Sequence, residues 1–383
     1  MTVLKSGSLR TVTITGYGSN GEGVARLDDG RVVFVRGAAR DDICQVVITD
    51  VRPKSCRAEI KQLIKPSEHR IEPDCSVFQK CGGCDFRHIT YEEELRAKLS
   101  RINDALRRIG NVSLQLKEII KTGKSDGYRN KAIFHTARCG TQTIIGFYAC
   151  NSHEVVPITN CLLLCEELNI ALKDSWDNPP AIGSDIMLRK GMKNTSNKHF
   201  HVEMDELVFR ISKFSFFQVN TDAALLLYQK AREYAALSKS ETLLDLYCGV
   251  GTLTLFIGRD AGHSIGIESN LDSIDDARNN AKDNGLDNVD FICADAADWD
   301  IGNIRPDCVV IDPPRSGLSS EVVKQIQKIQ PLRIVYISCD PATFARDIRL
   351  LDKYEIQKAC AVDMFPRTAN LECCALLKLK NIV

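Results

Sequence analysis

The sequence predicts an α/β protein with three domains, at residues 1–65, 66–214 and 215–383. From about residue 220, continuous apolar strands alternate with helical stretches, which is the pattern of a parallel sheet covered by helices on both faces. Residues 9–65 instead contain short strands separated by glycine and aspartate turns, which predict a small β-barrel. A cysteine-rich loop and an amphipathic helix follow this barrel and begin a central α+β domain.

The charge of the chain is balanced overall but uneven along its length. The 383 residues include 50 Lys and Arg and 50 Asp and Glu. Residues 1–130 carry 23 basic and 17 acidic side chains, which leaves 27 and 33 for residues 131–383. A basic first part and an acidic second part indicate a binding module joined to an enzyme.

Cysteine usage and the lack of long apolar runs predict a cytoplasmic protein with no membrane partner. Residues Met1 to Arg10 contain no apolar stretch typical of a signal peptide, and no run approaches the ~18 apolar residues that span a bilayer. Thiols stay reduced in the cytoplasm, so clusters among the sixteen cysteines indicate metal binding or catalysis rather than disulfides.

The N-terminal strands are typical of a barrel of the oligonucleotide-binding type, although a β-barrel without a ligand has the same composition. Asp29-Gly30 offers a hairpin turn between two of them. After Leu9, Val12 and Ile14, the expected strands are Val24 to Leu27, Val32 to Val35, Ile43 to Val47 and Arg57 to Ile60.

An amphipathic helix is predicted after the cysteine-rich loop, and Gly110 ends it. Its apolar face recurs at intervals of three and four residues: Leu95, Leu99, Ile102, Leu106 and Ile109. Its polar face, in solvent or against phosphate, would carry Arg96, Lys98, Arg101, Arg107 and Arg108. Surface loops are expected at residues 175–183 and 190–198.

The strands of the third domain are expected at Thr242–Leu246, Ser264–Ile267, Val289–Ile292, Cys308–Ile311 and Arg333–Ile337, with helices that include Asn270–Asn284 and Ser320–Ile329. Ligands of such sheets bind at the carboxyl ends of the strands. The first strand ends at Tyr247 and runs into Gly249, Gly251 and Thr252, where the backbone can approach a ligand closely.

Acidic residues end the next three strands and complete a predicted S-adenosylmethionine site. Glu268 suits the ribose hydroxyls, Asp295 suits the adenine amine, and Asp312 in Asp312-Pro313-Pro314 would face the reacting methyl group. A nicotinamide-binding unit also combines glycines with a later acid, but its GxGxxG spacing is missing here. The third domain is therefore predicted to be a Rossmann-like, S-adenosylmethionine-dependent methyltransferase domain.

A cysteine follows the fifth strand, in Ser338-Cys339-Asp340-Pro341. A thiol at the same edge of the sheet as the methyl donor indicates covalent attack on the acceptor, which an unactivated ring carbon requires. An amino methyltransferase would instead place an aromatic residue after Asp312-Pro313-Pro314, where this chain has Arg315. A non-enzymatic RNA-binding protein would not be expected to keep Glu268, Cys339 and Glu372.

These motifs together resemble the RNA uracil-C5 methyltransferases that carry an N-terminal TRAM domain and an iron–sulfur cluster, of the 23S rRNA (uracil-5-)-methyltransferase type. The resemblance spans nearly the whole chain. It rests on Cys75-x5-Cys81-Gly82-Gly83-Cys84, Tyr128-Arg129-Asn130-Lys131, Phe217-Gln218-Val219-Asn220, Asp245 to Gly251, Asp312-Pro313-Pro314-Arg315, Ser338-Cys339-Asp340-Pro341 and Phe365-Pro366-Arg367-Thr368 with Glu372.

The resemblance implies a role for each matching residue. Cys339 is the expected nucleophile, which adds to C6 of uracil, and Glu372 is the expected general base. The residues expected to contact the cofactor through the resemblance are Gln218, Tyr247 and Glu268, with Asp312 against the cofactor, the target base or both. Asp340 departs from the family pattern, in which asparagine is the commonest residue at this position. An ionised carboxylate close to Cys339 would raise the pKa of its thiol.

The cysteine-rich loop predicts a metal site. Cys75, Cys81 and Cys84 lie within ten residues, and four thiolates suit either zinc or a [4Fe–4S] cluster. The resemblance implies the iron–sulfur cluster, with Cys161 as the fourth ligand. Methylation needs no redox step, so the cluster would have a structural role. Cys165 is the main alternative for that position.

RNA is the expected partner of a monomeric enzyme. A uracil inside a helix cannot present C6 to a thiol, so the target would be a loop nucleotide or a flipped base. The resemblance implies that Arg129, Asn130 and Lys131 face the RNA. It favours 23S ribosomal RNA as the substrate, and the T-loop uridine of transfer RNA is the alternative.

Overall fold

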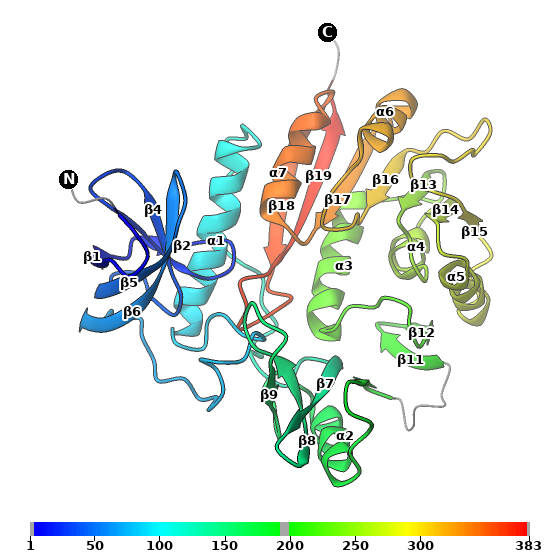
Figure 1. The fold of residues 1–383 in the computed structure, drawn as a ribbon. Helices are drawn as coiled ribbons and strands as arrows, with labels where there is room; N and C mark the ends of the chain where they lie inside the picture. Colours follow the sequence, from blue (N-terminus) through cyan, green and yellow to red (C-terminus); the bar gives the residue numbers. More distant parts are fainter. Residues whose placement is uncertain (1–3, 192–198, 381–383) are drawn as a thin grey trace. The chain divides into compact units, whose positions relative to one another are not determined.

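The computed structural model describes residues 4–191 and 199–380, and Figure 1 shows its helices and strands. The chain divides into two compact units. The first unit contains Met1–Arg101, Lys124–Leu188 and Phe365–Asn370. The second contains Ile102–Gly123, Arg189–Met364 and Leu371–Val383. Each unit is therefore built from segments that are far apart in the sequence.

A six-stranded sheet forms the first part of the first unit, in the order β1-β5-β6-β4-β3-β2. Its neighbouring strands are antiparallel except for the parallel pair β4 and β6. Alternate side chains, such as Val12, Val33 and Val46, pack into one core. The predicted strands and the turn at Gly30, which has φ 86°, are confirmed. The strands are β1 (Leu9–Thr13), β2 (Gly16–Tyr17), β3 (Gly23–Arg26), β4 (Val32–Val35), β5 (Ile43–Val51) and β6 (Ser55–Lys65).

The predicted amphipathic helix is α1 (Tyr91–Arg108), but one residue of its expected polar face is buried. Lys98, expected on the polar face, is only 1% exposed. Its ammonium group lies 2.7 Å from Glu94 Oε1 and also donates to the carbonyl of Phe365. The prediction for Lys98 was wrong because a buried partner four residues earlier on the helix compensates its charge.

A second sheet of the first unit has the order β10-β7-β8-β9 and packs with the helix α2 (Glu166–Asp177). The predicted loop at residues 175–183 was wrong at its start, because α2 continues to Asp177. Trp176 anchors this last turn by donating from its indole nitrogen to the carbonyl of Ile158 at 2.8 Å. The predicted loop at residues 190–198 falls outside the described residues from 192 onward. The strands are β7 (Lys131–Cys139), β8 (Gln142–Tyr148), β9 (Val155–Pro157) and β10 (Asp185–Arg189).

The second unit contains a seven-stranded sheet in the order β15-β14-β13-β16-β17-β19-β18. The first five strands in this order are parallel, and β19 runs antiparallel to both neighbours. All five predicted strands are confirmed, with ends that differ by at most one residue. The strands are β13 (Thr242–Leu246), β14 (His263–Glu268), β15 (Val289–Cys293), β16 (Cys308–Ile311), β17 (Arg333–Ser338), β18 (Tyr354–Val362) and β19 (Glu372–Leu379).

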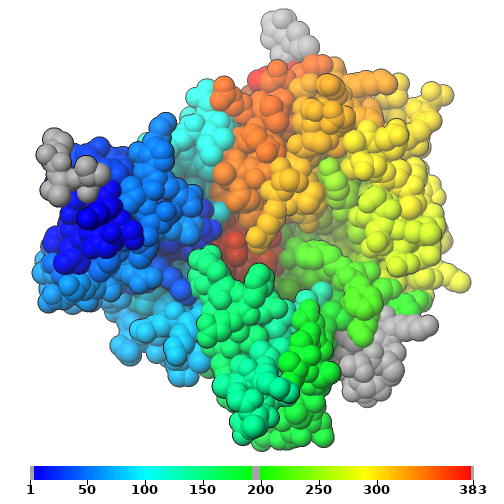
Figure 2. All heavy atoms as spheres, in the orientation of Figure 1, coloured from blue at the N-terminus to red at the C-terminus, as the bar shows by residue number. Residues whose placement is uncertain are grey.

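Helices connect these strands except between β15 and β16 and between β18 and β19. The helices α6 and α7 lie in the orange surface region of Figure 2. After β13 the chain forms β14 and β15, which extend the sheet toward one edge. It then returns to form β16 on the other side of β13. The ends of β13 and β16 therefore flank the switch point at which such sheets bind ligands. The helices are α3 (Thr221–Ala235), α4 (Thr252–Gly258), α5 (Leu271–Asp283), α6 (Ser320–Ile329) and α7 (Pro341–Leu350).

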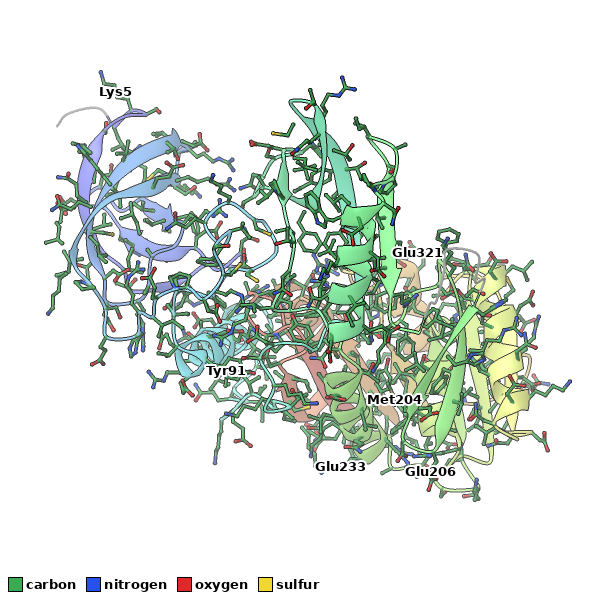
Figure 3. All side chains as sticks on the ribbon, turned by 90° about the horizontal axis from the view of Figure 1, so that it is seen from below. Lys5, Tyr91, Met204, Glu206, Glu233 and Glu321 are labelled. Carbon is green, nitrogen blue, oxygen red and sulfur yellow. The ribbon has the colours of Figure 1, made fainter. Side chains whose placement is uncertain are left out.

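A hairpin of β11 (His199–Met204) and β12 (Leu207–Ser212) packs on α5, and Figure 3 labels Met204 and Glu206 at its turn. Buried polar side chains of α5 hold it. Asn280 Oδ1 accepts from the backbone of Arg210 at 2.7 Å, and Asp276 Oδ2 accepts from that of Ser212 at 2.7 Å. These bonds position the segment that follows β12.

Across the described ranges, residues 4–191 and 199–380, no helix is both long and apolar enough to cross a bilayer.

Candidate active site

The turn after β13 lines a cavity and has an unusual backbone. Tyr247, Gly249 and Gly251 have φ values of 67°, 55° and 80°. This left-handed region is unfavourable for a residue with a side chain, so the surrounding structure must hold Tyr247 there. A Cβ atom on Gly251 would lie 2.9 Å from Cζ of Phe291, so this position requires glycine.

Glu268 ends the neighbouring strand β14 and faces this turn. Its Oε2 accepts a hydrogen bond from the backbone nitrogen of Gly249 at 3.2 Å, and its Oε1 accepts from that of Asn270 at 2.8 Å. The two backbone donors fix the carboxylate at the cavity while leaving lone pairs for hydroxyl groups of a ligand.

The cavity has a volume of about 760 Å³, and every residue that lines it belongs to the second unit. Six of the predicted cofactor residues lie on its wall: Gln218, Tyr247, Gly249, Thr252, Glu268 and Asp312. Gly251 shapes the turn without lining the cavity. Asp295 does not line it either, but its carboxylate contributes, after burial, to raising the pKa of Tyr247 and is therefore nearby.

The segment after β12 brings exposed aromatic side chains to the same cavity. Phe214 and Phe216 line it although they are 83% and 72% exposed, and the Lys213 ammonium lies 5.5 Å from the ring centroid of Phe214. Two large, exposed apolar side chains on the wall of one cavity are a candidate binding surface. Sequence reasoning missed them, although their spacing in Phe214-Ser215-Phe216-Phe217-Gln218 is visible in the sequence.

Cys339 follows β17 and is half-buried. Burial raises the pKa of its thiol to about 11. The carboxylates of Glu372 and Asp312 raise it further, whereas the Arg315 guanidinium lowers it by its charge and by a hydrogen bond. These four side chains therefore form one group, which we call the Cys339 cluster.

Glu372 is the first residue of β19 and is 3% exposed. Because Cys373 pairs with Ser338, β19 brings Glu372 beside the residue that follows β17. Burial raises the pKa of Glu372 well above its usual value, Asp312 raises it further, and Arg315 opposes them. A carboxyl group in such surroundings is a stronger base than one in water.

Asp312 connects the Cys339 cluster with the cavity, because it lines the cavity and acts on both Cys339 and Glu372. Burial raises its own pKa to about 6. Arg315 is the member of the cluster that sequence reasoning did not assign to the thiol. Its proximity depends on the parallel pairing of β16 with β17, which no local sequence signal records.

Asp340 caps the helix α7. Its Oδ1 accepts from the backbone nitrogen of Thr343 at 2.8 Å and from the Thr343 hydroxyl at 3.0 Å. A carboxylate at a helix N-terminus is favourable for both hydrogen bonding and the helix dipole. This explains how an acid is accommodated next to Cys339.

We expect Asp340→Asn to retain methylation activity, because asparagine caps a helix as well as aspartate does. Asp340→Ala should instead lose about 1 kcal/mol of unfolding free energy. Urea unfolding and initial methylation rates of both variants test this. An Asp340→Asn variant that folds normally but is inactive would show that the carboxylate itself is needed.

The four predicted metal ligands, Cys75, Cys81, Cys84 and Cys161, are free thiols in the first unit. Cys161 packs against the apolar core that contains Cys81. Burial raises the pKa of Cys84 to about 12, Arg87 opposes it, and the charges of Cys161 and Cys81 raise it further. No three His, Cys, Asp or Glu side chains among the described residues are grouped closely enough to hold a metal ion.

Comparison with known proteins identifies two segments of the chain. Residues 181–380 match the family described as tRNA (uracil-5-)-methyltransferase, and residues 4–61 match the TRAM domain. An uncharacterized RNA methyltransferase of Caldanaerobacter subterraneus is 33% identical over 452 residues, which cover 99% of this chain and 100% of the relative. Another, from Synechocystis sp., is 32% identical over 451 residues, with 98% and 97% covered.

A solved structure has the same fold. The tRNA (uracil-54, C5)-methyltransferase of Pyrococcus abyssi, in complex with S-adenosyl-L-homocysteine, superposes with a TM-score of 0.76 at 24% identity. The match covers 96% of this chain and 100% of that structure. The predicted combination of a Rossmann-like domain with an N-terminal TRAM domain is thereby confirmed.

Proposed function

We propose that this chain, which belongs to the tRNA (uracil-5-)-methyltransferase family and is an S-adenosylmethionine-dependent RNA methyltransferase, forms 5-methyluridine through a covalent adduct on Cys339. The observation that carries the mechanism is the Cys339 cluster beside the cavity. It combines a nucleophile, a buried carboxyl group and a cation at the edge of the sheet where the methyl donor would bind.

Bound S-adenosylmethionine would supply an electrophilic methyl group. The Cys339 thiolate adds to C6 of uracil and forms a carbon–sulfur bond, and the electron pair of the C5–C6 double bond makes C5 nucleophilic. After C5 has taken the methyl group, the Glu372 carboxylate removes the C5 proton. That electron pair restores the double bond and expels the thiolate. Arg315 favours the anionic forms of both Cys339 and Glu372.

The cavity residues named above are the proposed cofactor contacts, with Glu268 on the ribose and Gln218 and Tyr247 along the cavity wall. Asp295 remains a proposed contact of the adenine amine from the neighbouring strand end. Asp312 would face both the methyl group and the target base.

Glu268→Ala should weaken S-adenosylmethionine binding by about 10- to 100-fold, because hydrogen bonds to a charged group contribute about 1.5–3 kcal/mol. Isothermal titration calorimetry measures this directly. Glu321→Ala is the matched control, an exposed carboxylate at the start of α6 that is labelled in Figure 3. Unchanged affinity in Glu268→Ala would refute the ribose contact.

RNA recognition would use Phe214 and Phe216, which line the cavity and are exposed. Exposed aromatic rings of this kind stack on unpaired bases. Arg129, Asn130 and Lys131 remain proposed RNA contacts of the first unit. We favour 23S ribosomal RNA as the substrate. The second candidate is the T-loop uridine of transfer RNA, which the name of the Pyrococcus abyssi structure supports.

The test of the function uses S-adenosylmethionine with a labelled methyl group and transcripts of 23S ribosomal RNA and transfer RNA. Mass spectrometry of the digested nucleosides should find label in 5-methyluridine from one transcript only. Label in transfer RNA alone would exclude the ribosomal substrate. Label in another nucleoside would overturn the assignment of C5 chemistry.

We also propose that the four cysteines hold a [4Fe–4S] cluster in a structural role. Two observations support a donor set of this kind: Cys161 and Cys75 both act electrostatically on the free thiol of Cys81, and the backbone nitrogen of Gly83 already donates to the sulfur of Cys81 at 3.4 Å. Four thiolates suit this cluster or zinc, and the ligands would be Cys75, Cys81, Cys84 and Cys161.

Protein purified without oxygen should contain about four iron and four sulfide ions per chain. Cys161→Ala should lose them, whereas Cys165→Ala should keep them. Metal analysis and visible absorption measure the content independently of activity. One zinc ion per chain, or loss of iron in Cys165→Ala only, would contradict the assignment.

The three domains at residues 1–65, 66–214 and 215–383, a monomeric state and a cytoplasmic location complete the proposal.

A further inference from the structure

Two cysteines lie directly opposite each other on the last two strands of the second unit. Cys360 of β18 pairs with Cys374 of β19 in antiparallel register. Opposite residues in such a ladder project to the same face, with Cβ atoms about 4.5–5.5 Å apart. A disulfide needs about 3.5–4.5 Å, so a small contraction would suffice to join them. Both are free thiols, and neither has a role in the methylation proposed above.

The surroundings make the two thiols unequal. Cys374 is buried, and burial raises its pKa well above the usual value. Cys360 is half-buried, and its pKa is lowered, first by a hydrogen bond with Cys374 and then by one with Tyr234, with a contribution from the charge of Lys230. A more accessible, more acidic thiol beside a buried one is the arrangement of a reactive cysteine with its resolving partner.

Tyr234 and Lys230, which lower the pKa of Cys360, belong to α3, which packs on β18 and β19. Figure 3 labels Glu233, which also lies in this last part of α3. Its carboxylate is 3.8 Å from the Lys358 ammonium and opposes the effect of Lys230 on Cys360. The accessible thiol therefore has one cation, Lys230, acting on it, and Glu233 partly offsets that charge.

We propose that Cys360 and Cys374 are a redox-active pair that closes into a cross-strand disulfide when hydrogen peroxide is present. The Cys360 thiolate would attack one peroxide oxygen to give a sulfenic acid, and the other oxygen would leave as hydroxide and become water. The Cys374 thiol would then attack the sulfenic sulfur, form the disulfide and release a second water molecule. The two thiols lose two electrons, which reduce the peroxide. A dithiol reverses the reaction.

Closure of the pair should reach the Cys339 cluster, and this consequence rests on the proposed role of Glu372. Glu372 lies two residues before Cys374 on β19, so it projects to the same face, opposite Val362. Drawing Cys374 toward β18 would shift the backbone of β19, and with it the side chain of Glu372. No residue of β18 or β19 lines the cavity, so cofactor binding should not change.

The experiment exposes reduced, full-length protein to graded hydrogen peroxide, blocks the remaining thiols and maps the peptides by mass spectrometry. We expect a linked pair of peptides that contain Cys360 and Cys374, which disappears after dithiothreitol. Cys360→Ser should abolish the link and Cys373→Ser, next in sequence but on the opposite face, should keep it. Oxidation of Cys360 to a sulfinic acid without the link, or oxidation of the exposed Cys293 before this pair, would overturn the proposal.

Methylation is measured in the same samples. In the wild type, kcat should fall several-fold and recover with dithiothreitol, while the affinity for S-adenosylmethionine stays constant. The Cys360→Ser variant cannot form the disulfide but still contains Cys339, so any activity that it loses comes from oxidation of Cys339. It should therefore lose less activity than the wild type. Equal losses in both proteins would refute the effect on Glu372. Peptide mapping detects the disulfide whether or not the protein methylates RNA. A failure of the disulfide proposal can therefore be distinguished from a failure of the proposed methylation mechanism.

Discussion

Cys339→Ala should abolish methylation, with a fall in kcat of at least about 10⁴-fold, because the target carbon is not activated without the thiolate. The most direct measurement uses RNA that contains 5-fluorouridine together with S-adenosylmethionine. Fluorine at C5 cannot be removed as a proton, so wild-type protein should remain attached to the RNA on a denaturing gel. The Cys339→Ala variant should form no such complex.

Two controls identify the cause of that loss. Cys339→Ala should bind S-adenosylmethionine with unchanged affinity, because Cys339 does not line the cavity. Cys308→Ala, which removes another buried thiol of the same sheet, should still form the complex. A Cys339→Ala protein that still methylates RNA, or wild-type activity without any trapped complex, would refute the covalent mechanism.

Glu372→Gln should lower kcat by about 10²- to 10⁴-fold, the usual contribution of a general base. The adduct should form and take up the methyl group but fail to eliminate, so a methylated covalent complex with ordinary uridine should accumulate. Gel analysis with a labelled methyl group measures it. Glu321→Gln, at the exposed start of α6, is the matched control. Loss of activity without this accumulation would assign proton removal to another group.

The same substitution should change how stability depends on pH. The pKa of Glu372 is raised in the folded protein, so above the ordinary glutamate pKa the folded state binds more protons than the unfolded state. The free energy of unfolding of the wild type should therefore decrease as the pH rises from that value toward the folded pKa. Glu372→Gln removes this contribution, so its stability relative to wild type, measured by urea unfolding, should increase as the pH rises above the ordinary glutamate pKa of about 4.3. A constant difference would show that Glu372 is ionised in the folded protein.

The parts of the site that come from single strand ends were predictable. Tyr247, Glu268 and Asp312 each directly follow or end an apolar strand, and parallel strands bring such ends to one edge. The structure places all three on one cavity. Phe214 and Phe216 were missed because their segment follows a hairpin, and its position depends on hydrogen bonds with α5 rather than on a local signal.

The surroundings of two charged side chains, Lys98 and Asp340, also could not be predicted from local sequence. A lysine in an amphipathic helix is ordinarily exposed, yet Lys98 is buried because Glu94 and a carbonyl from residue 365 meet it there. An aspartate next to a nucleophile is expected to oppose ionisation, yet Asp340 is directed to the first turn of α7. Both outcomes depend on the partners that folding supplies.

The sequence by itself determined the N-terminal strands, the five parallel strands of the second unit, the glycine turn and the nucleophile and base candidates, because these depend on local periodicity and short motifs. Only the tertiary structure decided which side chains became neighbours. Arg315 approaches Cys339 because β16 pairs with β17, and Cys360 faces Cys374 because β19 inserts antiparallel between β17 and β18. Strand pairing is set by the packing of the whole sheet, and residues that are far apart in sequence carry no local record of it.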